Sequence, residues 1–115
     1  MQPIQFTPAR TTGPLAADTY VCSVAKVEVG RSPHGHEVWR VEFVVRQGRF
    51  AGRILRYDLP FARRIRRRAR AFRRYLGVGE GRVPKLTPDQ LIGRTCLLNV
   101  WIHPYEGRRI WVEPE

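Results

Sequence analysis

Lysine, acidic residues, cysteine and long apolar runs are all scarce in this chain of 115 residues. Only two of its 21 basic residues are lysines, and ten acids leave a formal net charge of +11. No apolar run has membrane-spanning length and no secretory signal pattern occurs, so we expect a cytoplasmic protein without a membrane partner. Cys22 and Cys96 lie in apolar segments without the spacing of a metal site. We therefore expect them to be reduced core thiols.

Motifs for catalysis or cofactor binding are missing as well. The sequence contains no paired-carboxylate motif, no G-x-S-x-G, no phosphate-binding P-loop and no H-E-x-x-H. The three histidines, His34, His36 and His103, form no familiar metal-ligand spacing with the cysteines. We therefore expect a protein that is not an enzyme and that holds neither metal nor cofactor.

Arginine, in contrast, is abundant and concentrated in one segment. Phe61–Leu76 reads FARRIRRRARAFRRYL, and eight of its sixteen residues are arginine. Its apolar residues recur at helical spacing, which predicts one amphipathic α-helix over the whole segment; they are Phe61, Ile65, Ala69, Phe72 and Leu76. No acid occurs from Pro60 to Gly79. Because guanidinium matches phosphate and stacks on bases, we expect a polyanionic partner. A merely solvated arginine face is the plainer alternative.

Five segments have the composition of β-strands. They are Thr19–Val29, Glu37–Arg46, Arg53–Leu59, Thr95–His103 and Arg108–Glu113. Pro60, with Asp58 as a candidate cap, should precede the helix, and Gly77 should end it. The pattern predicts an all-β fold with one helix, a five-stranded Greek-key barrel of the oligonucleotide-binding (OB) type with the α-helix between strands 3 and 4. Its long first strand would bend and pair on both sides. An open α+β sheet fits the same periodicity.

The domain organisation follows from the same pattern. Residues 1–17 contain three prolines and little periodicity, so we expect a flexible N-terminal arm. Residues 18–115 should form a single OB-type domain.

Several motifs support a family suggestion. They are Tyr20–Val29, RSPHGHE at Arg31–Glu37, VWRVEFVV at Val38–Val45, QGRFAGR at Gln47–Arg53, YLG at Tyr75–Gly77, LIGRTCLLNV at Leu91–Val100 and YEGRRIWV at Tyr105–Val112. Together they resemble small phage-type single-stranded DNA-binding proteins with an OB fold, long catalogued as a phage family of unknown function. The resemblance implies a protein that coats or protects single strands in replication or recombination. It also implies a bacterial cell that is phage-infected or carries a prophage, where the protein would be nucleoid-associated. The arginine-rich helix departs from the family pattern.

Sequence-tolerant binding of single strands needs a cationic groove and aromatic faces on which bases stack. Strand alternation points Trp101 and Trp111 outward, although large aromatics of this kind also lie under a helix or an arm. Arg40 and Arg56 should lie on the second and third strands, which usually line the OB binding face. The complete expected set is Arg40, Phe50, Arg53, Arg56, Tyr57, Arg63, Arg64, Arg66, Arg67, Arg70, Arg73, Arg74, Trp101, Tyr105, Arg109 and Trp111.

The sequence therefore predicts a largely sequence-independent single-stranded DNA-binding protein. Two alternatives stay open. One is an RNA-binding OB module that uses the same surface. The other is a structural adaptor that docks its arginine-rich helix on an acidic partner. Further candidate partners are copies of the chain itself and proteins of replication or recombination.

Overall fold

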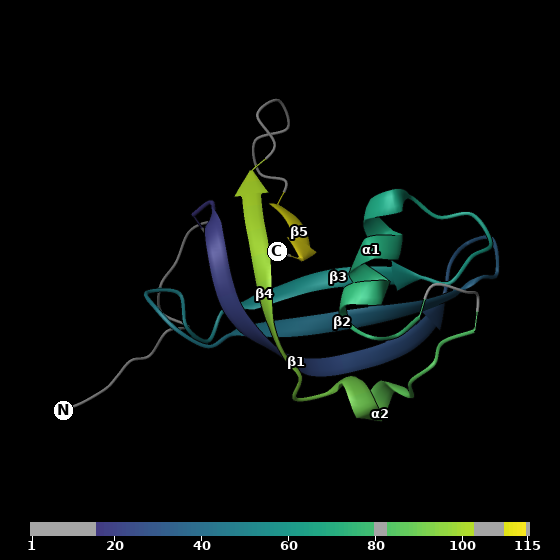
Figure 1. Ribbon diagram of the computed structural model, residues 1–115, viewed down its shortest axis with the longest axis horizontal. Helices are drawn as coiled ribbons and strands as arrows, with labels where there is room; N and C mark the ends of the chain where they lie inside the picture. Colours follow the sequence, from purple (N-terminus) through teal and green to yellow (C-terminus); the bar gives the residue numbers. More distant parts are fainter. Residues whose placement is uncertain (1–15, 80–82, 103–109, 115) are drawn as a thin grey trace.

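The computed structural model describes residues 16–79, 83–102 and 110–114 (Figure 1). In this part of the chain the structure is mostly β, with a curled antiparallel sheet and two short helices, which confirms the prediction of a β-rich fold at this coarse level. The elements are β1 (Asp18–Arg31), β2 (Glu37–Val45), β3 (Ile54–Pro60), α1 (Arg67–Tyr75), α2 (Pro88–Leu91), β4 (Thr95–Ile102) and β5 (Ile110–Pro114).

The sheet has the strand order β3-β2-β1-β4-β5. Its long first strand pairs with β4 through residues 18–23 and with β2 through residues 22–31, so it bends between two partners as expected. The register with β2 shifts between Val24 and Lys26. A bulge of this kind bends a strand and increases its twist. The curl of β1 in Figure 1 follows from it, and it brings β3 and β5 near each other at the two ends of the order.

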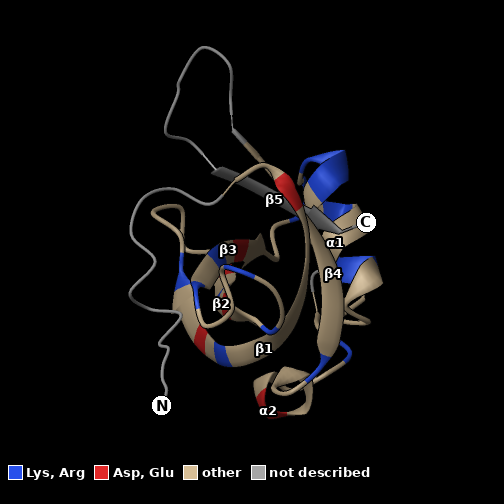
Figure 2. Cartoon of the chain, turned by 90° about the vertical axis from the view of Figure 1, so that its left-hand side faces the viewer, with Lys and Arg blue, Asp and Glu red and all other residues tan. Residues whose placement is uncertain are grey.

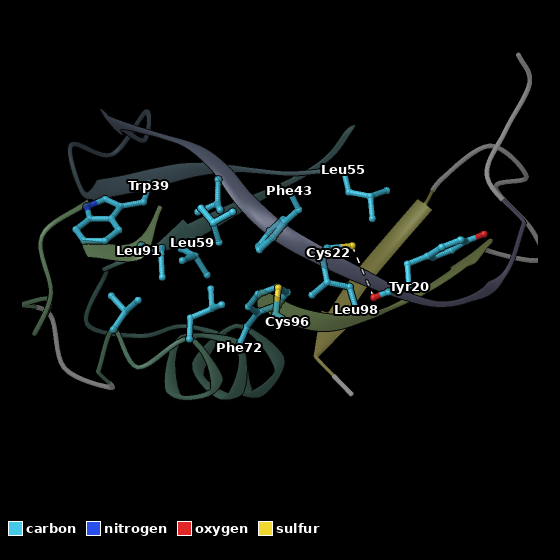
Figure 3. Close-up of a cluster of buried hydrophobic side chains, with 14 of the residues drawn as sticks. Tyr20, Cys22, Trp39, Phe43, Leu55, Leu59, Phe72, Leu91, Cys96 and Leu98 are labelled. Carbon is cyan, nitrogen blue, oxygen red and sulfur yellow. Dashed lines mark hydrogen bonds between the residues drawn. The ribbon is translucent and has the colours of Figure 1, made fainter. Parts of the chain in front are cut away.

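The core lies inside this curl (Figure 3). Alternate residues of the paired strands are buried there, as period-2 alternation requires; they include Tyr20, Cys22, Val24, Trp39, Val41, Phe43, Val45, Leu55, Leu59, Cys96, Leu98 and Val100. Phe72 and Leu76 of α1 and Leu91 of α2 complete the cluster. Trp39 and Phe43, which share the apolar face of β2, are both fully buried.

The predicted helix over Phe61–Leu76 is wrong in its extent. α1 begins only at Arg67, and its N-cap, Arg66, is extended and forms no side-chain cap. The reason lies in the sheet, because Phe61 N–H donates to the Glu37 carbonyl at 3.0 Å and so prolongs the β2–β3 ladder. Pro60 accordingly ends β3 and does not start the helix. The first turn of α1 also has no acid to offset its N-terminal dipole and its repelling arginines.

Other helix boundaries agree with the chemistry of their caps. Gly77 follows α1 with φ of 77°, a left-handed conformation that suits glycine, so the predicted helix end is confirmed. The short helix α2 is additional to the single predicted helix, and a Thr87–Gln90 capping box with proline in the first turn starts it. No helix in the described ranges is long and apolar enough to cross a membrane.

Candidate nucleic-acid interface

An open groove of about 1250 Å³ lies beside the edge strand β3. Its walls are the turn between β1 and β2, the outer side of β2 and β3, and the connection from β3 to α1. Five exposed arginines line it, namely Arg40, Arg56, Arg63, Arg64 and Arg66. Apolar side chains lie between them, namely Val38, Tyr57, Pro60, Ala62, Ile65 and Ala69. The groove therefore combines cations that suit phosphate with apolar surface that suits a base.

Strand alternation explains how β3 contributes to this groove. Leu55 and Leu59 point into the core, which sends Arg56 to the outside as predicted. Beyond Pro60 the chain leaves the sheet, but the buried Phe61 keeps it anchored through a ring contact with Trp39 at 5.1 Å. The next five residues therefore cross the surface as a bent connection between two fixed points.

Arg73 is the second anchor of this connection, and it is excluded from the phosphate-binding role predicted for it. Its side chain is 0% exposed, with the guanidinium 4.2 Å from the centroid of the Phe61 ring. Nη1 donates to the Pro60 carbonyl oxygen at 3.1 Å. The cation–π contact and the hydrogen bond offset the cost of burying this charge. Arg73 thereby ties α1 to the end of β3. The connection that carries the groove arginines lies between these two elements.

Charges on the outer face of β1, β2 and β3 alternate in sign and cancel between two neighbouring rows. One row of neighbours in register is Lys26, Glu42 and Arg56, and the next is Glu28, Arg40 and Asp58. Arg56 Nε lies 3.1 Å from Glu42 Oε2, a partly exposed ion pair of small energetic weight. Arg40 and Arg56 thus belong both to the groove and to a face whose six charges sum to zero. That face alone offers a polyanion little attraction.

The excess positive charge lies instead on the β3–α1 connection and on α1. All arginines of residues 63–74 except Arg73 are exposed. Figure 2 shows the corresponding blue segments gathered around α1, whereas β1 carries both red and blue. Arg67, Arg70 and Arg74 share this exposure but line none of the hollows described here. The arginines nearest the groove are therefore those that precede the helix.

Tyr57 links the groove to a second hollow of about 430 Å³. Both hollows are lined by Tyr57, Arg66 and Ala69. The Tyr57 ring is half-buried and stacks on Phe72 of α1, with centroids 4.4 Å apart and planes at 16°. Tyr57 lies on the same side of β3 as Leu55 and Leu59, and it contributes to the lining of both hollows.

The second hollow extends the groove toward β4. It reaches Arg68, whose guanidinium lies 5.3 Å from the centroid of the Trp101 ring. Trp101 is half-buried, so it is neither fully outward, as strand alternation predicts, nor sealed under a helix or an arm. Arg68 was not among the expected binding residues, although it belongs to the same arginine-rich segment, and that composition was the available signal. Arginines and aromatic rings thus follow one another from Arg56 and Tyr57 through Arg66 and Arg68 to Trp101.

Phe50 and Arg53 lie outside the groove, on the β2–β3 turn at the other end of β2 and β3. Phe50 is half-buried, and its ring makes an edge contact with Tyr20 at 6.2 Å. The guanidinium carbons of Arg49 and Arg53 lie 5.5 and 5.8 Å from the centroid of the Phe50 ring. The expected residues therefore do not form a single site.

Arg67, Arg70 and Arg74 lie in neither the groove nor the β2–β3 turn, Arg73 is buried, and three further predicted residues have no described side chain. Tyr105 and Arg109 lie outside the described residues, as does most of the expected N-terminal arm. Trp111 lies on β5 opposite Trp101 in register, but its side chain is not among those described.

The two cysteines are opposite each other on β1 and β4. Both are free and buried, as predicted for core thiols. Burial raises the pKa of Cys22 to about 12, with a further contribution from Cys96, and burial raises the pKa of Cys96 to about 11. Among the described residues no group of three or more His, Cys, Asp or Glu side chains could hold a metal ion. The thiols are neutral packing groups at neutral pH.

Comparison with known proteins adds no identity to this site. No protein-family model matches the chain, and a search of curated proteins finds no significant match. The function proposed below therefore rests on the groove and its charges.

Proposed function

We propose that the protein binds single-stranded DNA in the groove beside β3, largely without sequence preference, and that its curled sheet is an OB-type barrel. The strand order supports the fold, because a barrel opened between its third and fifth strands has the order β3-β2-β1-β4-β5. OB barrels are partly open and bind oligonucleotides at the face of strands 2 and 3 and at the adjoining loops. The groove lies beside this face. Replication and recombination, which expose single strands, are the processes that would use such a protein.

The single observation that carries the proposal is the combination of exposed arginines with a half-buried tyrosine in one groove. Arg63, Arg64 and Arg66 are placed to neutralise phosphates along the connection, and Arg68 continues the line. Tyr57 offers an unpaired base an aromatic ring that α1 already holds from one side. Stacking of this kind contributes about 1–3 kcal/mol per base and tolerates any base.

Duplex DNA should bind less tightly than a single strand. In a duplex the bases stack on one another and only phosphates and groove edges are accessible, so Tyr57 and Trp101 gain no partner. If about four phosphates meet Arg63, Arg64, Arg66 and Arg68, the logarithm of the affinity should fall with the logarithm of salt concentration at a slope near −2.8.

Fluorescence anisotropy with one pyrimidine-rich oligonucleotide tests the proposal. It is measured as single-stranded DNA, as matched RNA and as duplex DNA, each over a range of salt concentrations. The proposal expects the tightest binding to single-stranded DNA, with the salt dependence given above. Tighter binding to the RNA would make the same groove an RNA-binding site, since the 2′-hydroxyl is the group that differs. Equal affinity for single strand and duplex would contradict the role of the aromatic rings.

A further inference from the structure

The β2–β3 turn forms a second cationic and aromatic surface, separate from the groove. Its sequence, Arg46–Arg53, contains three arginines and no acid. Gly48 and Gly52 adopt φ of 84° and 92°, which closes the turn tightly and presents Phe50 between them. Phe50 is half-buried and flanked by the guanidinium groups of Arg49 and Arg53. A ring and two cations are thus gathered at one end of the sheet.

A hollow of about 410 Å³ adjoins this turn. Phe50, Tyr20 and Arg49 line it, together with the exposed Asp18 and Gln47. Aromatic surface is thus combined there with a cation and with polar groups that can accept or donate hydrogen bonds. The same combination in the groove supports the binding of a base and its phosphate. The turn therefore offers the chemistry of one further nucleotide contact.

The arginines of the β3–α1 connection and the β2–β3 turn lie at opposite ends of β3. The connection follows Pro60 and Arg53 directly precedes Ile54, so the seven residues of β3 separate them. At about 3.3 Å per residue this is roughly 23 Å. Between them lie the rows of Lys26–Glu42–Arg56 and Glu28–Arg40–Asp58, whose six charges sum to zero and attract phosphate weakly. A stacked strand rises about 3.4 Å per nucleotide, so about seven nucleotides would span the distance.

We infer that the β2–β3 turn is a second contact for the same polynucleotide, with Phe50 stacking a base and Arg49 and Arg53 holding the adjoining phosphates. This inference rests on the proposed binding of single strands in the groove. It assigns to the protein a two-part site, in which a short oligonucleotide occupies the groove alone and a longer one reaches both surfaces.

Two oligonucleotides separate the contacts, one of about four and one of about sixteen thymidines, the limits of site size for OB folds. Phe50→Leu removes the aromatic face but keeps apolar packing against Tyr20. A double variant, Arg49→Gln with Arg53→Gln, removes both cations and keeps the Phe50 ring. Lys85→Gln is the control, because Lys85 is exposed and lines neither surface. Thermal unfolding of each variant verifies the fold.

The inference expects Phe50→Leu and the double variant each to weaken binding of the long strand by at least about fivefold and to leave the short strand within about twofold of the unmodified protein. A long oligonucleotide can occupy any single site in more positions along its length than a short one. Each variant is therefore compared with the unmodified protein on the same oligonucleotide. Equal losses at both lengths, or no loss on the long strand, would overturn the inference. Failure of the unmodified protein to bind either strand would instead refute the proposed function.

Discussion

Removal of the three arginines on the β3–α1 connection should abolish most of the salt dependence of binding. Arg63, Arg64 and Arg66 all line the groove and are all exposed, so replacing them with glutamine removes three phosphate contacts and little packing. Each contact to a single strand contributes about 0.7 to the slope of log affinity against log salt. The slope should therefore become shallower by about 2.1, and affinity at about 0.1 M salt should fall about a hundredfold.

A matched variant distinguishes contact from general attraction. Arg67→Gln, Arg70→Gln and Arg74→Gln remove the same charge from exposed positions of α1 that line none of the hollows. Anisotropy titrations of both triple variants over a series of salt concentrations give the two slopes. The groove variant should lose most of the slope and the α1 variant much less. Equal changes in the two would refute the assignment of the phosphate path to the groove.

Other substitutions and pH changes test the remaining parts of the structure. Trp101→Ala should weaken binding of a pyrimidine-rich strand by about fivefold to a hundredfold in the same titration, because one stacking surface is lost; unchanged affinity removes Trp101 from the path. Arg73→Ala should lower the free energy of unfolding in urea by about 2–4 kcal/mol, because a fully buried side chain loses its contacts with Phe61 and Pro60. A loss below about 0.5 kcal/mol would contradict its role as an anchor. Folding raises the pKa of Cys22 from 9.0 to about 12 and that of Cys96 from 9.0 to about 11. As pH rises, these thiols therefore lose their protons in the unfolded chain before they lose them in the folded protein. Stability should therefore fall as pH rises from about 9 to about 12, less steeply in a Cys22→Ser variant.

Local patterns predicted the parts of this protein that depend on alternation along one strand. The inward Leu55 and Leu59 and the outward Arg56 follow from a period of two, and so do the buried Trp39 and Phe43. The cationic excess near residues 63–74 follows from composition alone. These features need no knowledge of which strands are neighbours.

Features that depend on register and on long-range contacts could not be predicted in the same way. The helix begins six residues late because Phe61 is tied to Glu37, across a pairing that the sequence does not reveal. Arg73 fits the polar side of an ideal helix, but the late start of α1 places it above the Phe61 ring. The cancelling charges of the outer face become visible only once three strands are aligned.

The location of Phe50 likewise needed the structure. Its turn and the groove stand at opposite ends of β2 and β3, so residues expected in one site divide between two surfaces. Tyr57 was among the expected binding residues, although alternation places it on the same side of β3 as the buried Leu55 and Leu59. The stacking on Phe72 that fixes its ring comes from α1.

The most direct measurement is an NMR titration of the isotopically labelled protein with an oligothymidine strand. The amides of residues 62–66 and the ring signals of Tyr57 and Trp101 should move together and saturate at one affinity. Signals from α2 should stay in place, since it lines no part of the groove. Shifts confined to α2, or an unchanged spectrum at saturating strand concentration, would contradict binding in the groove.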